Sequence, residues 1–362
     1  MEKIKSINVA TFLTMSFFLA GVCLASKNGG EVHVNTHNQE KLRFEKVFNI
    51  VGEPSFAIIQ DKDGFIWSGS TSSGLIRYDG YDLKYFKAGK NSVSTNWVND
   101  VFEDSEGCIW LGTQGGGLNK YDKKTGKFTW YKHKPGNKNS IADNTFSLSF
   151  SLILEDRDDP DILWLGTQGG LDKFHKKKEM FTHYSHIPGD GASLSSNEIM
   201  SIAQDKDGII WIGTKNGGLN RFDRTTGRSI HYRHDPNNSG SLSDNWIWSL
   251  MADDDHILWI GTSKGGLNKF DIKTTEFTRY THDAKNQNSI PKMEICFIKK
   301  NQAGNLLMGE AYGSGSGLVE FDRNTEVFTI HKNDPDDEDS LPENSISAVL
   351  EDRTGILWIS FT

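Results

Sequence analysis

The strongest candidate chemistry in this chain lies in aromatic and acidic residues that stand where an otherwise regular sequence departs from its own pattern. These residues are Trp97, Glu198, Trp246, Trp248, Glu310 and Tyr312. Aromatic faces stack on the C–H faces of sugars, and carboxylates accept hydrogen bonds from hydroxyl groups. We therefore predict that the six side chains share one surface and contact a small polar ligand, an oligosaccharide. The alternative is that they only fill space, because aromatic residues also plug channels and one unit of a repeat can drift.

The same carboxylates allow an acid–base hypothesis. Glu198, Glu294 or Glu310 could transfer a proton in a lyase-type reaction. A general base also needs an orienting partner within hydrogen-bond reach, and the sequence places none beside these residues. We assign no catalytic residue and no cofactor.

Metal ligands are the third chemistry that the residue types allow. Histidines recur two residues after a tyrosine, at His133, His186, His234 and His282, and Asn333 takes the corresponding place further on. Repetition at one position spreads these imidazoles around the molecule, too far apart to share an ion. The segments Asp61–Gly64 and Asp205–Gly208 resemble calcium loops but lack the remaining oxygen ligands. We predict hairpin turns there and no metal site.

These candidates are set into a repeat. An aliphatic strand with a tryptophan inside it, followed in most copies by Gly-Thr, recurs at intervals of 43 to 54 residues. Its anchors are Trp67, Trp110, Trp164, Trp211, Trp259, Leu307 (in place of tryptophan) and Trp358. A period in this range is typical of a repeat architecture. We predict that the six tryptophans are structural and pack against the adjoining unit.

Each unit holds four short apolar or alternating runs separated by Gly, Asn, Asp and Pro. This pattern indicates four antiparallel strands for each repeat and no long helix. Four strands in about 45 residues are typical of a propeller blade. The predicted fold is therefore all-β, a seven-bladed β-propeller with four-stranded antiparallel blades. The net charge of −8 provides no basic face, so nucleic-acid binding is not expected.

The N-terminal segment has the composition of an export signal. Lys3 and Lys5 precede an apolar run from Val9 to Leu24, and small residues end at Ala25. We predict a signal peptide over residues 1–25, with an uncleaved membrane anchor as the alternative, and a linker over residues 26–41. Val22 before Cys23 does not suit a lipoprotein signal. Cys108 and Cys296 fall in different units, so no disulfide is expected.

The ends of the repeat region should close the ring. The run from Leu42 to Phe48 is a strand with no blade of its own, whereas the seventh unit stops at Thr362 after two strands. We expect the run to supply the outer strand of the seventh blade. The propeller thus covers residues 42–362, with its seventh blade incomplete at the C-terminus, as in a truncated chain.

The fourth unit carries a family resemblance. Asp205-x-x-Gly208-Ile209-Ile210-Trp211-Ile212-Gly213-Thr214, followed by Gly217-Gly218-Leu219-Asn220-Arg221-Phe222-Asp223, resembles the two-component regulator propeller. In that family such repeats form the periplasmic sensor region of hybrid two-component histidine kinases of Bacteroidetes. The resemblance implies a periplasmic location and a longer receptor with a second propeller, a β-sandwich, one membrane helix, and kinase, receiver and DNA-binding modules. It also implies a homodimeric receptor.

Together these patterns predict an extracytoplasmic sensor propeller that detects glycans and has no enzymatic activity of its own, because the kinase would lie in domains absent from this chain. Two alternatives remain: a secreted propeller that acts as a protein-binding scaffold, and a lyase-type propeller enzyme.

Overall fold

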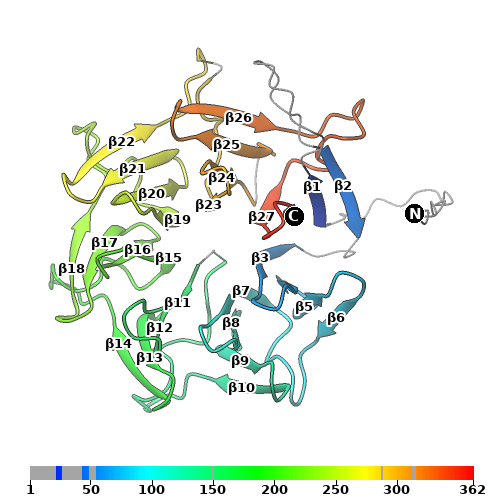
Figure 1. The fold of residues 1–362 in the computed structure, drawn as a ribbon. Coiled ribbons are helices and arrows are strands. Elements are labelled where there is room, and N and C mark those ends of the chain that lie inside the picture. The colour runs from blue at the N-terminus through cyan, green and yellow to red at the C-terminus, as the bar shows by residue number, and fades with distance from the viewer. Residues whose placement is uncertain (1–21, 27–42, 49–53, 149–150, 287, 312–314) are drawn as a thin grey trace.

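The computed structural model describes residues 22–26, 43–48, 54–148, 151–286, 288–311 and 315–362. Its 28 strands form seven four-stranded antiparallel sheets arranged as blades around a common centre (Figure 1). The predicted seven-bladed propeller is confirmed. No helix in the described ranges is long and apolar enough to cross a membrane.

Strand order within a blade runs from the centre of the ring to its periphery. The first strands are β3 (Ser55–Gln60), β7 (Val98–Glu103), β11 (Ile153–Glu155), β15 (Ile199–Gln204), β19 (Ile247–Ala252), β23 (Phe297–Lys300) and β27 (Ile346–Glu351). The second strands are β4 (Ile66–Ser70), β8 (Ile109–Thr113), β12 (Ile162–Thr167), β16 (Ile210–Thr214), β20 (Ile257–Thr262), β24 (Leu306–Gly309) and β28 (Leu357–Phe361).

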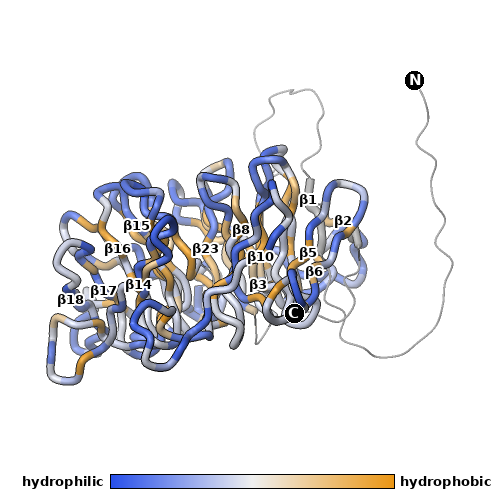
Figure 2. Tube along the Cα trace, turned by 90° about the horizontal axis from the view of Figure 1, so that it is seen from below, coloured by the Kyte–Doolittle hydropathy of each residue, from blue (hydrophilic) through white to orange (hydrophobic). Residues whose placement is uncertain are grey.

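The outer halves of the first six blades follow the same order. Their third strands are β5 (Leu75–Tyr78), β9 (Leu118–Asp122), β13 (Gly170–His175), β17 (Gly218–Asp223), β21 (Leu267–Asp271) and β25 (Leu318–Asp322). Their fourth strands are β6 (Leu83–Phe86), β10 (Lys127–Tyr131), β14 (Met180–Tyr184), β18 (Arg228–Tyr232), β22 (Glu276–Tyr280) and β26 (Val327–His331). Figure 2 shows apolar residues along the strands and hydrophilic residues in the loops of both faces.

The second-strand tryptophans lie between neighbouring blades. The exposed fraction of Trp211 is 0 %, and its ring packs edge-on against Phe270 of the next blade with ring centroids 5.4 Å apart. Equivalent pairs join the other blades that carry the tryptophan: Trp67–Tyr121, Trp110–Phe174, Trp164–Phe222, Trp259–Phe321 and Trp358–Tyr78. Aromatic burial at these interfaces therefore fixes how adjacent blades pack.

In five blades a buried aspartate before the hairpin turn orients the indole. In blade 4, the Trp211 Nε1–H donates to Asp205 Oδ2 at 2.8 Å, and the amides of Asp207 and Ile209 donate to Asp205 Oδ1. The same indole–carboxylate bond, at 2.7–2.9 Å, occurs in four more blades: Trp67–Asp61, Trp110–Asp104, Trp164–Asp156 and Trp358–Asp352. Gly208, with φ of 81°, permits the tight turn between them.

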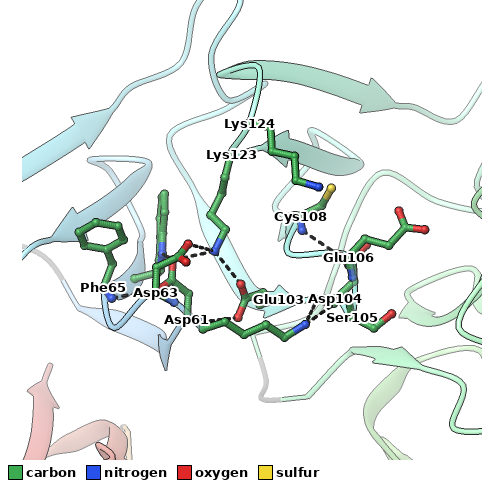
Figure 3. Close-up of polar contacts among 12 residues, drawn as sticks. Asp61, Asp63, Phe65, Glu103, Asp104, Ser105, Glu106, Cys108, Lys123 and Lys124 are labelled. Atoms are coloured by element: carbon green, nitrogen blue, oxygen red, sulfur yellow. Dashed lines mark hydrogen bonds and ion pairs between the residues drawn. The ribbon is translucent and has the colours of Figure 1, made fainter.

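A cation from the following blade completes several of these aspartate sites. Lys123 lies just after β9, and Figure 3 shows its ammonium in contact with Asp61, Asp63 and Glu103. The three N–O distances are 2.7–3.1 Å. Lys176 bonds Asp104 in the same way. Burial alone would raise the pKa of Asp104, but hydrogen bonds from Trp110, the Cys108 amide and Lys176 outweigh it and lower that pKa. The carboxylate is therefore ionised and links two blades.

Blade 6 departs from this pattern in a coordinated way. Leu307 replaces the tryptophan, Asn301 replaces the aspartate, and Glu320 on β25 pairs across from Leu307. In blades 2, 3 and 5 the residue at the Glu320 position is a lysine whose ammonium lies 5.4–5.9 Å from the centre of the tryptophan ring. Without an indole to contact, Glu320 Oε1 instead accepts hydrogen bonds from Asn301 and Asn305.

The seventh blade is built from both ends of the chain. Its sheet runs β27, β28, β1 (Val22–Ser26) and β2 (Arg43–Phe48), all antiparallel. The expected outer strand is confirmed, since β2 lies in this sheet, although it pairs with β1 and not directly with β28. The third strand, which the sequence analysis did not expect, comes from Val22–Ser26. Four of these residues fall within the predicted signal peptide, an assignment that stays a prediction.

Replacing a tryptophan anchor should destabilise the whole ring. We expect Trp211→Ala to lower the free energy of unfolding by about 3–5 kcal/mol, because it empties a fully buried ring site between two blades. Urea unfolding followed by circular dichroism measures this change. Tyr81→Ala, at a residue that is 93 % exposed, is the control and should alter the free energy of unfolding by less than about 0.5 kcal/mol. Equal midpoints for both variants would contradict the packing role.

The closure by β2 can be tested at Phe44. Its side chain is 7 % exposed in the core that blade 7 shares with blades 1 and 6, and its amide donates to Asp339 O at 3.0 Å. Phe44→Ala should therefore lower the free energy of unfolding by about 3–5 kcal/mol. A thermal midpoint identical to that of the unmodified protein would show that β2 is not docked in solution.

Candidate ligand-binding rim

Three of the predicted ligand residues occupy one repeated place on the ring. Each of them directly precedes the first strand of its blade: Trp97 precedes β7, Glu198 precedes β15 and Trp246 precedes β19. The carbonyl of each accepts the amide that follows the second strand of its blade, at 3.0 Å, in the pairs Gln114–Trp97, Lys215–Glu198 and Ser263–Trp246. All three therefore lie on the face of the ring where the first strands begin.

Blades 4 and 5 bring aromatic and charged groups together on this face. Trp246 and Trp248 stack with ring centroids 5.3 Å apart and an interplanar angle of 29°. The Lys215 ammonium lies 5.1 Å from the centre of the Trp246 ring and 3.4 Å from Glu198 Oε2. The Trp246 Nε1–H is buried and has no hydrogen-bond acceptor among the described residues. We call Glu198, Lys215, Trp246 and Trp248 the rim cluster.

Lys215 was not a predicted site residue, although the sequence holds its signal. The position after the second-strand threonine varies between units, as Gln114, Gln168, Lys215 and Ser263. Because this residue bonds the backbone at the start of the first strand, its side chain belongs to the same face as the predicted residues. The backbone contact is therefore constant at this position while the side chain differs from unit to unit.

The other predicted residues are placed differently. Glu310 is 5 % exposed; its Oε1 accepts the Glu294 amide at 3.5 Å and its Oε2 accepts from Ser316 Oγ at 3.1 Å. Glu294, in turn, accepts from Ser263 Oγ at 2.6 Å, which connects blade 6 to the rim cluster through Ser263. Glu310 thus holds the backbone of Glu294 and the side chain of Ser316 in place, and its carboxylate is not exposed to solvent.

Trp97 and Tyr312 are not joined to the rim cluster. Trp97 belongs to blade 2, is 37 % exposed, and makes no ring contact with the cluster within the described ranges. Tyr312 lies outside the described residues. The structure therefore unites three of the six predicted residues, Glu198, Trp246 and Trp248, around a lysine.

The repeated histidines clamp the loops between blades. His133 Nδ1 lies 2.8 Å from Ile141 O, and His186, His234 and His282 make the same contact with the carbonyls of Leu194, Leu242 and Ile290. Asn333 replaces the imidazole with its amide, which donates to Leu341 O at 2.7 Å. This substitution preserves the bond, so the position requires a hydrogen-bond donor for a carbonyl and not a metal ligand.

Blade 3 contains an acid–base pair that arises from linked replacements. In blades 2, 4 and 5 an asparagine on the third strand donates to a serine hydroxyl of the preceding loop, as Asn220 does to Ser195 at 2.7 Å. Blade 3 has Asp172 and Ala142 at these positions, and Asp172 Oδ1 contacts His183 Nδ1 instead. His183 Nε2 lies 2.8 Å from Lys138 O. Both imidazole nitrogens therefore face acceptors, which favours the protonated ring and leaves none for catalysis.

This pair should make stability depend on pH. Pairing with Asp172 raises the pKa of His183, and burial raises the pKa of Asp172, so the folded pair holds protons more tightly than the unfolded chain does. Its stabilisation is fully present below about pH 6.5, the ordinary histidine value, and is lost as pH rises through the raised pKa. We expect the urea midpoint to fall between about pH 6 and about pH 9. Asp172→Asn, which restores the residue of the other blades, should flatten this decline; an unchanged slope would contradict the assignment.

A comparison with known protein families identifies what four of these repeats are similar to. Four segments match the family described as two component regulator propeller: residues 92–115, 193–216, 241–264 and 340–362. Each segment runs from the loop before a first strand through the second-strand region. These four segments are thus similar to two-component regulator propeller repeats. Among curated proteins, no significant match was found.

Solved structures share the fold of this propeller at low sequence identity. The extracellular domain of the putative hybrid two component system BT3049 from B. thetaiotaomicron is 24 % identical with a TM-score of 0.69, covering 84 % of this chain and 40 % of that one. The extracellular domain of the putative hybrid two component system BT4673 from B. thetaiotaomicron is 23 % identical with a TM-score of 0.65, covering 85 % of this chain and 37 % of that one. The present chain thus spans about two fifths of these relatives.

A propeller of another class also shares the fold. Virginiamycin B lyase from Staphylococcus aureus is 10 % identical with a TM-score of 0.59, covering 85 % of this chain and 95 % of that one. At this level of identity the likeness shows the architecture alone.

Proposed function

We propose that this regulator propeller is the extracytoplasmic ligand-sensing part of a two-component receptor, and that it detects an oligosaccharide through the rim cluster. The observation that carries the proposal is the stacked pair Trp246–Trp248 beside the Lys215–Glu198 ion pair. Such a pair offers an aromatic surface for a sugar ring and charged groups for its hydroxyls. The segments similar to regulator repeats and the shared fold with extracellular domains of putative two-component systems support a sensing role.

The export prediction and the receptor context fit this proposal. A signal peptide over residues 1–25 would deliver the propeller to the periplasm, where the repeats would face external ligands. Signalling to a kinase, and the homodimer through which it would act, belong to the longer receptor that the resemblance implies. Glycan recognition is the function proposed for the present chain.

The lyase alternative receives less support from the carboxylates that it would use. Glu294 and Glu310 accept hydrogen bonds from Ser263, Ser316 and the Glu294 backbone, and Glu198 is paired with Lys215. These contacts position the rim and do not place a base beside an orienting acid or imidazole.

Isothermal titration of the propeller against a panel of neutral and acidic oligosaccharides tests the proposal. A glycan that binds should lose at least about tenfold in affinity, or about 1.4 kcal/mol, in the double variant Trp246→Ala plus Trp248→Ala, because the stacking surface is removed. Trp130→Ala, which removes an exposed tryptophan on the outer strand β10, is the matched control and should bind normally. Thermal melting confirms that each variant is folded. Undiminished binding by the double variant, or no binding by the unmodified protein, would contradict the proposal.

A further inference from the structure

The centre of the ring contains a cavity that the proposed glycan site does not use. Its volume is about 120 Å³, and residues of the first strands or their starts in blades 1, 2, 3, 6 and 7 line it. Most of the lining residues are apolar, but Phe56 and Phe297 are only 1 % exposed, so Ile59 and Phe102 are the large apolar side chains that are partly exposed there. The polar side chains among the lining residues are Asp100, Ser151 and Lys299. The cavity therefore has a mixed apolar and polar lining with one cation in its wall.

Lys299 is exceptional at its place in the repeat. The corresponding first-strand residues of the other blades are apolar: Ile59, Phe102, Leu154, Ala203, Met251 and Leu350. Its side chain is exposed to solvent, and it is among the residues that line the cavity. Among the described residues, no hydrogen-bond acceptor is bonded to its ammonium. An unpaired ammonium in a cavity wall can pair with an anionic group of a ligand.

Asp100 interacts electrostatically with Lys299, but its carboxylate accepts its hydrogen bonds from backbone amides. Its Oδ2 accepts the amides of Leu152 and Ile153 at 2.7 and 2.9 Å, and its Oδ1 accepts the Val101 amide at 3.0 Å. The side chain is 5 % exposed and joins the first strand of blade 2 to that of blade 3. The carboxylate oxygens are thus directed at peptide groups and not at the ammonium.

Serines make equivalent links elsewhere in the ring. Ser201 Oγ accepts the Leu250 amide at 3.1 Å, and Ser249 Oγ donates to Ile295 O at 2.9 Å, each across one blade interface. A charge is therefore unnecessary for this structural role. Asp100 can be replaced by the residue that the ring itself uses at the same place.

We propose that this cavity binds a small organic anion, with a carboxylate on the Lys299 ammonium and a short apolar body against Ile59 and Phe102. A cavity of about 150 Å³ in another protein holds benzene, so the present space suits a body of about four to six carbon atoms. The Lys299–carboxylate contact supplies charge selectivity, and the apolar part of the wall contacts the body of the ligand. This site lies within the channel and is separate from the rim cluster, so it goes beyond the proposed glycan sensing.

Fluorine NMR with 4,4,4-trifluorobutyrate and its neutral amide tests the inference on the full chain at constant ionic strength. The unmodified protein should bind the carboxylate at least about fivefold more tightly than the amide, because only the carboxylate pairs with Lys299. Lys299→Met keeps the length of the side chain without its charge and should abolish this preference. Lys178→Met, at an exposed lysine in the turn after β13, is the matched control and should retain it.

A second variant decides the matter if Lys299→Met fails to fold, as judged by thermal melting. Asp100→Ser removes the opposing negative charge and should tighten carboxylate binding by about threefold or more while leaving amide binding unchanged. The inference is overturned if the unmodified protein shows no preference for the carboxylate, if folded Lys299→Met keeps that preference, or if Asp100→Ser leaves carboxylate affinity unchanged.

Discussion

The bond between a buried aspartate and a tryptophan indole is the interaction on which the ring depends. The aspartate closes the hairpin turn through backbone amides, fixes the indole of its own blade, and in several blades receives a cation from the next. A buried carboxylate would be costly without these partners. Because the same group serves the turn, the blade and the interface, local geometry and blade packing are set together.

The sites with chemical potential lie where this scaffold does not determine the side chain. The residue before a first strand gives its carbonyl to the backbone, so the ring accepts tryptophan, glutamate or serine there. The same holds for the residue after the second strand, which includes Lys215. A constant backbone contact with a variable side chain allows one architecture to present different surfaces to different ligands.

The sequence predicted the blades because their determinants are local. Tryptophan spacing, aspartate–glycine turns and alternating runs each act within a few residues, and the seven blades follow from them. Glu310 could also have been placed, since it occupies the position of Thr113, Thr214 and Thr262, which are buried and bond the backbone. The sequence could not predict β1, because its pairing with β28 joins residues from opposite ends of the chain, and the apolar composition of that segment favours an export signal. Nor could it predict the Asp100 link or the His183–Asp172 pair, whose partners belong to loops and strands of neighbouring blades.

The replacement of tryptophan by Leu307 makes one joint of the ring unlike the others. Each blade contacts only its neighbours, so the resistance of a closed ring to opening is set joint by joint. Among the described residues, the joint between blades 6 and 7 lacks the tryptophan–aromatic pair and the indole–carboxylate bond, although Phe44 and His331 make an edge-on ring contact across it. We infer that this joint opens more readily than the others. Blade 6 also carries Lys299, which lines the cavity in the channel. The same blade carries Glu294 and Glu310, which connect it through Ser263 to the rim cluster. A ligand bound at either place would therefore contact blade 6 beside this joint. Its binding free energy would change the equilibrium between the closed and the opened ring.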